Sequence, residues 1–220
     1  MKSVGRVALA GGALLAASAA FSSVSYADTF LLTSDHCTGG CGTPPFGTVT
    51  VTQVGTAVDF SVSLADSNQF VLTGSADNQY FKFNGATGAI TVTQNVPGVT
   101  LTGDSGAFNG DGTGNFNFGV TCTPIAPNTS CAVGGGAALP VGTVLTFAVA
   151  NTTLAQVEQP NNLGNIFVAD ILSGTTGNTG PVDVTAVPVP GPSVGAGLPG
   201  LLAACTALIA LARRRRQLVV

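Results

Sequence analysis

The sequence predicts an all-β fold, an antiparallel β-sandwich or jelly-roll-like domain over residues 28–186. Three observations predict it. Short segments that alternate apolar with polar residues recur along this region. Gly, Asn and Asp separate these segments, as they do in turns between strands. No segment of the region sustains the 3.6-residue period of an amphipathic helix, and eight or more strands at this spacing are typical of a sandwich.

The clearest strands form a predicted hairpin. Residues 48–52 alternate Thr with Val, and residues 58–64 place four apolar side chains on one face. The turn between them contains Gly55 and Thr56. We therefore expect two adjacent antiparallel strands here.

Further strand candidates follow at short intervals. Two of them are more continuously apolar, which predicts strands covered on both faces. The sequence shows no internal repeat, which counts against the alternative of a parallel β-solenoid. The candidates are residues 69–72, 80–83, 89–93, 116–122, 144–150 and 166–172, of which the last two are the apolar ones.

The N-terminal residues predict export. Lys2 and Arg6 precede an apolar run over residues 7–20, and Ser25 and Ala27 are small residues at the positions that a signal peptidase recognises. We expect residues 1–27 to be a signal peptide, cleaved after Ala27. The domain would then fold outside the cytoplasm, with signal peptidase as a transient partner.

The C-terminal residues predict a transmembrane helix. Residues 194–212 are 19 residues without a charge, and a helix of that length spans roughly 28 Å, close to the hydrocarbon thickness of a bilayer. A cluster of arginines at one end of a span holds that end in the cytoplasm, which leaves the domain outside. An ordinary single-span anchor is the simplest interpretation of this tail. The cluster consists of Arg213, Arg214, Arg215 and Arg216.

The order of parts in residues 187–220 carries a resemblance to a known family. A Val187-Pro188-Val189-Pro190 stretch, an apolar span and a terminal arginine cluster resemble the PEP-CTERM sorting signal of Gram-negative bacteria. Val189 stands where that signal has its glutamate. The resemblance implies an inner-membrane precursor that an exosortase-type membrane protease cuts. It also implies a mature form that is secreted or at the cell surface, with exopolysaccharide as a candidate partner.

The charges lie in separate parts of the chain. Six of the seven basic residues lie outside residues 28–186, while all ten acidic residues lie within that range. Lys82 is therefore the only base of the predicted domain, and ten acids minus one base give a net charge of −9. Nucleic acid is excluded as an expected partner because phosphate recognition needs a basic face. An acidic surface rich in Thr, Asn and Ser suits carbohydrate or divalent cations.

Four cysteines of the domain predict two local disulfides, Cys37 with Cys41 and Cys122 with Cys131, because export exposes them to an oxidising compartment. Four cysteines allow three connectivities, and spacing alone does not choose among them. A metal site or reactive thiol around residues 35–41 is the alternative. The chain has a single histidine, so a zinc site lacks ligands and no metal is expected. Cys205 is expected to be a buried residue of the apolar span.

No catalytic motif accompanies the single histidine, His36, and we expect a protein that is not an enzyme and holds no cofactor. One rival is a secreted hydrolase acting on polysaccharide through Glu158 and an aspartate. The absence of tryptophan argues against a sugar-stacking cleft.

Residues 103–115 are the best candidate for a binding loop. Asn109, Asp111 and Thr113 alternate with glycines as in a calcium loop, but Val120 stands where the closing glutamate is required. A calcium-dependent adhesion or carbohydrate-binding module is therefore a second rival. Our principal expectation is a non-enzymatic exported protein of the bacterial envelope or extracellular matrix.

Overall fold

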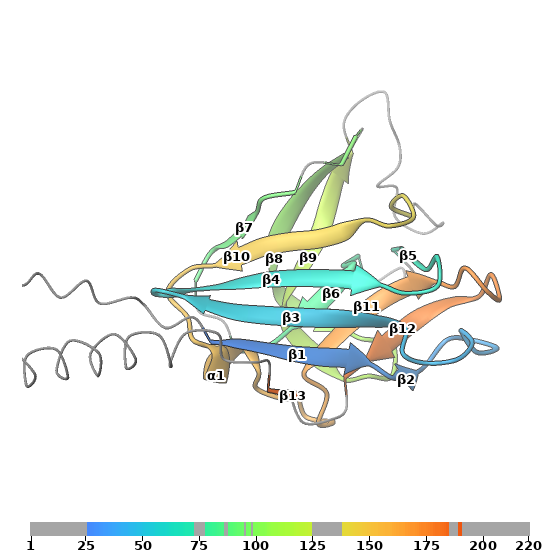
Figure 1. Ribbon diagram of the computed structural model, residues 1–220, viewed down its shortest axis with the longest axis horizontal. Helices are drawn as coiled ribbons and strands as arrows, with labels where there is room; N and C mark the ends of the chain where they lie inside the picture. Colours follow the sequence, from blue (N-terminus) through green and yellow to red (C-terminus); the bar gives the residue numbers. More distant parts are fainter. Residues whose placement is uncertain are drawn as a thin grey trace, which may run out of the picture.

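The structure is a computed structural model that describes residues 26–72, 78–85, 88–94, 96–97, 99–124, 138–184 and 189–190. These residues form two antiparallel sheets that face one another across a single apolar core (Figure 1). The predicted all-β, sandwich-like class is confirmed. Among the described residues no helix is long and apolar enough to cross a membrane. The predicted signal helix and the predicted span at residues 194–212 lie outside the described residues.

The first sheet has the strand order β13-β1-β3-β4-β10-β7. Every neighbouring pair in it is antiparallel. Its strands are β1 (Ala27–Leu32), β3 (Gly47–Val54), β4 (Ala57–Leu64), β7 (Ile90–Val92), β10 (Val144–Val149) and β13 (Val189–Pro190).

The second sheet has the order β2-β12-β11-β6-β9-β8, and β5 also pairs with β11. A single α-helical turn, α1 (Leu154–Val157), follows β10 among the described residues. The strands are β2 (Ser34–Asp35), β5 (Gln69–Phe70), β6 (Phe81–Phe83), β8 (Val99–Asn109), β9 (Asn115–Pro124), β11 (Phe167–Leu172) and β12 (Thr179–Asp183).

The predicted hairpin is confirmed as β3 and β4, which pair with Val51 opposite Phe60. The turn between them contains Gly55 at a φ of 59°, a conformation that glycine adopts without steric cost. Apolar residues of both strands face the core, while Asp59 and Ser61 are exposed. Period-two alternation therefore identified both the strands and their buried face.

The two continuously apolar segments differ in the structure. β11 is covered on both faces, as predicted, because Phe167, Val168 and Asp170 are all fully buried. The same prediction for residues 144–150 is wrong. In β10 only alternate residues such as Leu145 and Phe147 are buried, since Val144 and its same-face neighbours meet solvent.

Phenylalanines from both sheets fill the core. The rings of Phe60 and Phe147 stack with centroids 4.5 Å apart, and Phe30 meets Phe167 of the other sheet edge-on at 5.0 Å. Truncating such a ring to alanine typically costs about 3–5 kcal/mol. This cluster fixes the two sheets against one another, so the loops at their ends have a rigid support. Its members are Phe30, Phe60, Phe81, Phe83, Phe147 and Phe167.

Candidate functional site

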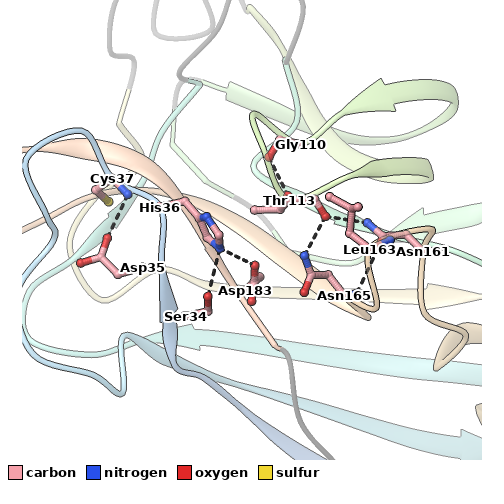
Figure 2. Close-up of polar contacts among 10 residues, drawn as sticks. All are labelled: Ser34, Asp35, His36, Cys37, Gly110, Thr113, Asn161, Leu163, Asn165 and Asp183. Atoms are coloured by element: carbon pink, nitrogen blue, oxygen red, sulfur yellow. Dashed lines mark hydrogen bonds and ion pairs between the residues drawn. The ribbon is translucent and has the colours of Figure 1, made fainter.

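His36 lies beside β2 and contacts two side chains through one ring nitrogen (Figure 2). Its Nε2 is 3.0 Å from Ser34 Oγ and 2.9 Å from Asp183 Oδ2. A Ser-His-Asp relay needs the serine and the aspartate on opposite ring nitrogens. These three side chains therefore do not form a relay, although the sequence contains the right residue types.

Asp183 is fully buried, and burial raises the pKa of its carboxyl group, while His36 and Ser34 oppose that shift. Ser34 and Asp183 are also opposite one another where β2 pairs with β12. The histidine thus closes a polar contact across two strands. These contacts assign His36 a structural role, which is to link β2 with β12.

The predicted Cys37–Cys41 disulfide is confirmed, with Cα atoms 5.5 Å apart. The Asp35 carboxylate accepts the backbone N–H groups of Cys37 at 2.9 Å and Cys41 at 2.8 Å. Gly39 and Gly40 turn the loop at φ values of 87° and 82°. Among the described residues, the one cluster of at least three metal-ligand side chains is Asp35, Cys37 and Cys41. Because its sulfurs are bonded to each other and its carboxylate binds the backbone, it is a closed structural loop.

Cys122 is also disulfide-bonded. Cys131 lies outside the described residues, so its pairing with Cys122 stays a prediction. The Sγ atom of Cys122 is 3.1 Å from the hydroxyl oxygen of Tyr80. Burial raises the pKa of Tyr80 to about 12, which keeps its hydroxyl protonated. Cys205 and the arginines at 213–216 likewise lie outside the described residues.

Glu158 is hydrogen-bonded to the carboxyl group of Asp28. Burial and the proximity of Asp28 raise the pKa of Glu158 to about 7. The two carboxyl groups of a glycosidase stand about 5–5.5 Å or about 6.5–9.5 Å apart, with the sugar or a water between them. Carboxyl groups in direct contact leave no such gap, so this pair gives the hydrolase interpretation no support.

Of the predicted binding loop at residues 103–115, residues 103–109 belong to β8, and only residues 110–114 form the tight turn between β8 and β9. Asn109 Oδ1 accepts the N–H of Asp111, and Thr113 Oγ1 donates to the Gly110 carbonyl at 2.6 Å (Figure 2 draws the Thr113 contact). Asp111 and Gly114 have φ values of 44° and 101°. The turn thus engages the Asn109 and Thr113 side chains that would have been ligands. The calcium interpretation gains nothing from this geometry.

The only base of the predicted domain is inside the protein. Lys82 Nζ is 2.8 Å from Asp170 Oδ2, and both side chains are fully buried. In a strand that alternates apolar and polar residues, Lys82 between Phe81 and Phe83 is expected on the face opposite the core. The sequence therefore did not predict the buried pair. Its consequence is that no Lys or Arg side chain faces solvent among the described residues.

A groove with a volume of about 510 Å³ lies between the end of β6, the start of β9 and the segment after α1. None of the described residues that line it has a charged side chain. Six amide side chains line it: Asn84, Asn115, Asn117, Gln159, Asn161 and Asn162. We call this feature the amide groove.

Hydrogen bonds to the backbone fix the walls of the amide groove. Asn84 Oδ1 accepts the N–H of Asn117 at 2.9 Å. The Nδ2 groups of Asn161 and Asn165 both donate to the Thr113 carbonyl at 2.7 Å, which Figure 2 shows between them. The segment after α1 is thereby tied to the β8–β9 turn.

Other amides of the groove remain available to a ligand. Within the described part of the chain, the side chains of Asn115, Asn117 and Gln159 make no hydrogen bond, and all three are exposed. Each offers one acceptor oxygen and two donor hydrogens. Sequence reasoning noted the Asn-rich composition but missed the groove, because its residues come from three segments far apart in the chain.

No family model, no curated protein and no solved structure matches this chain. Its function is therefore inferred from its own residues.

Proposed function

We propose that this chain is a non-enzymatic, exported protein of the bacterial envelope or extracellular matrix whose β domain binds neutral polysaccharide in the amide groove. The observation that carries the proposal is a groove of about 510 Å³ that is lined by six amide side chains and by no charged side chain of the described residues.

The chemistry of the groove favours hydroxyl groups as its ligands. Amides donate and accept at once, which matches sugar hydroxyls that also do both. The exposed amides of Asn117 and Gln159 need no rearrangement of the groove walls, since their side chains are not part of the hydrogen bonds that fix those walls.

Electrostatics favours a neutral polymer over an acidic one. Ten acids and one base between residues 28 and 186 give the domain a net charge of −9, and the one base is buried. Repulsion between like charges therefore disfavours polymers of uronic acid or sulfated sugars, most strongly at low salt. No cationic side chain of the described residues lines the groove to pair with a carboxylate or sulfate.

Delivery by the two chain ends is part of the proposal. The predicted signal peptide at residues 1–27 would direct export, and the tail that resembles a PEP-CTERM signal would hold the precursor in the inner membrane. An exosortase-type protease would then release the domain near Pro190. The sandwich domain between these ends carries two features typical of exported proteins, the Cys37–Cys41 disulfide and the strongly acidic composition.

Two geometric facts favour binding over catalysis. His36 meets Ser34 and Asp183 through the same nitrogen, and Glu158 touches Asp28 directly. Neither arrangement has room for a relay or for an attacking water.

Affinity electrophoresis of the exported protein tests the proposal. We expect a neutral glucan, mannan or galactan in the gel to retard the protein, and alginate to have no such effect. The double substitution Asn117→Ala with Gln159→Ala should raise the dissociation constant at least roughly tenfold, because it removes hydrogen bonds of about 1 kcal/mol each. Ser61→Ala, on the exposed face of β4, is the matched control and should bind as the wild type does.

Retardation by alginate alone, or by no polymer, would contradict the binding proposal. Equal retardation of the wild type and the double variant would place binding outside the amide groove.

A further inference from the structure

The predicted signal-peptide cut lies within the pairing of the first sheet. β1 begins at Ala27, and Asp28 is opposite Val51 of β3 on one side and Pro190 of β13 on the other. The amide nitrogen of Asp28, which a cut after Ala27 would free, thus belongs to a strand held on both sides. Figure 1 shows the start of β1, β13 and α1 at the same end of the sandwich.

Two carboxyl groups meet at this end. Glu158 follows α1 and is hydrogen-bonded to Asp28, and both residues are only partly exposed. The Oε1 atom of Glu158 is buried and has no hydrogen-bond partner among the described residues. Contact between two partly buried acids disfavours the state in which both are ionised.

No cation from the neighbouring elements compensates these acids. Neither β3, α1 nor β13 contains a titratable side chain, and Asp28 is the only one in β1. β11 also contacts β1, but its one titratable group, Asp170, binds Lys82. His36 binds Asp183. The bases of the described residues are thus engaged elsewhere.

We propose that removal of residues 1–27 supplies the missing cation, because the new α-ammonium group of Asp28 forms the ionic partner of the Asp28–Glu158 carboxyl pair. This inference depends on the cut after Ala27, which belongs to the proposed function. Hydrolysis breaks the Ala27–Asp28 peptide bond, and water gives its hydroxyl group to Ala27 and a proton to the nitrogen of Asp28. The amine then takes up a second proton from solvent.

The position of β1 makes this ammonium a fixed group. A free α-amino group has a pKa of about 7.7–8, so it is mostly protonated at neutral pH, and nearby carboxylates favour the protonated form. Pairing of Asp28 with Val51 holds its backbone in place. The amino terminus of the processed protein is therefore a structural charge of the folded domain.

A double-mutant cycle on the full exported chain tests the inference. One change inserts Gly-Ser-Gly-Ser between Ala27 and Asp28, which keeps the recognition residues before the cut and moves the ammonium away. The other is Glu158→Gln, which keeps the size of the side chain and removes its charge. Intact mass first establishes the amino terminus of each protein, and thermal unfolding at pH 8 then compares all four.

With Asp28 as the amino terminus, Glu158→Gln should lower the Tm because it removes the partner of the ammonium. In the inserted protein the same substitution should raise the Tm, because it removes an uncompensated acid. An equal shift of the Tm in both backgrounds overturns the inference, as does an amino terminus other than Asp28.

Titration of the Glu158 carboxyl group by NMR is the second measurement, and it does not depend on how cooperatively the variants unfold. We expect a lower pKa of Glu158 in the processed protein than in the inserted one, and equal values contradict the inference.

Polysaccharide binding of the four proteins separates this inference from the proposed function. Loss of the coupling with binding intact refutes the ammonium contact alone, whereas absence of binding in all four refutes the binding proposal alone.

Discussion

Two carboxylate contacts in this domain differ in whether the fold provides a cation. Asp170 lies in the second sheet with Lys82 at 2.8 Å, and both are fully buried. Glu158 lies at the end of the first sheet against another acid, Asp28. With a single base available between residues 28 and 186, the fold uses it where burial is complete. Asp28 and Glu158 are therefore stabilised by binding a proton or, as we propose, by the ammonium group of the processed amino terminus.

The largest effect is expected from breaking the buried ion pair. Lys82→Met should destabilise the protein by about 3–5 kcal/mol, because it leaves the Asp170 carboxylate buried without that partner. Urea unfolding measures the loss. The double variant Lys82→Met with Asp170→Leu is the control and should recover part of it. A double variant as unstable as the single one would show that the pair itself stabilises the fold.

A smaller effect is expected at His36, whose side chain is partly exposed while its partner Asp183 is fully buried. His36→Ala removes the contact with the buried Asp183 and should cost about 1–3 kcal/mol. His36→Gln retains a donor and should cost less. Neither substitution should change polysaccharide binding, since His36 lies outside the amide groove, and loss of an activity with the fold intact would contradict the non-enzymatic proposal.

The uncompensated acid pair predicts a pH dependence. In a protein that retains residues before Asp28, the pKa of Glu158 is raised from 4.5 to about 7. The folded state then binds the proton more tightly than the unfolded state, so stability should fall as pH rises from about 4.5 through 7. Glu158→Gln should flatten this part of the curve. Urea midpoints between pH 4.5 and pH 8 measure it, and an unchanged slope in the variant would assign the dependence to another group.

The smallest effect is expected at an exposed acid. Asp59 lies on the outer face of β4, so Asp59→Asn should change the free energy of unfolding by less than about 0.5 kcal/mol. The same urea experiment serves as a baseline for the other variants. A larger change would mean that the net charge of the domain, and not the individual contacts, sets its stability.

Local patterns predicted the parts of the fold that depend on local chemistry. Alternation over residues 48–64 identified the β3–β4 hairpin, and predicted export to an oxidising compartment led us to expect the Cys37–Cys41 disulfide. The sequence pattern could not show that one face of β10 is exposed to solvent. Whether a strand face is buried depends on elements that are distant in the sequence and pack against it. The same limit applies to Lys82, whose partner Asp170 is 88 residues away.

The candidate site was still harder to predict. The amide groove joins Asn84, Asn117 and Gln159 only after β6, β9 and the segment that follows α1 are brought together. Val189 and Pro190 were identified as parts of a sorting motif, and no alternation indicated that they would pair with β1. Their pairing is a backbone contact that side-chain patterns do not encode.

The pairing of β13 with β1 also determines how the domain responds to mechanical load. β13 contributes two residues to the edge of the sheet, opposite Asp28 and Thr29. Tension applied to the chain beyond Pro190 acts first on these two positions, and an edge strand that peels away one residue at a time yields at low force. The phenylalanine core lies behind β1 and β3 and bears no load until β13 has detached. A pull on the tail therefore detaches β13 from β1 before it unfolds the domain.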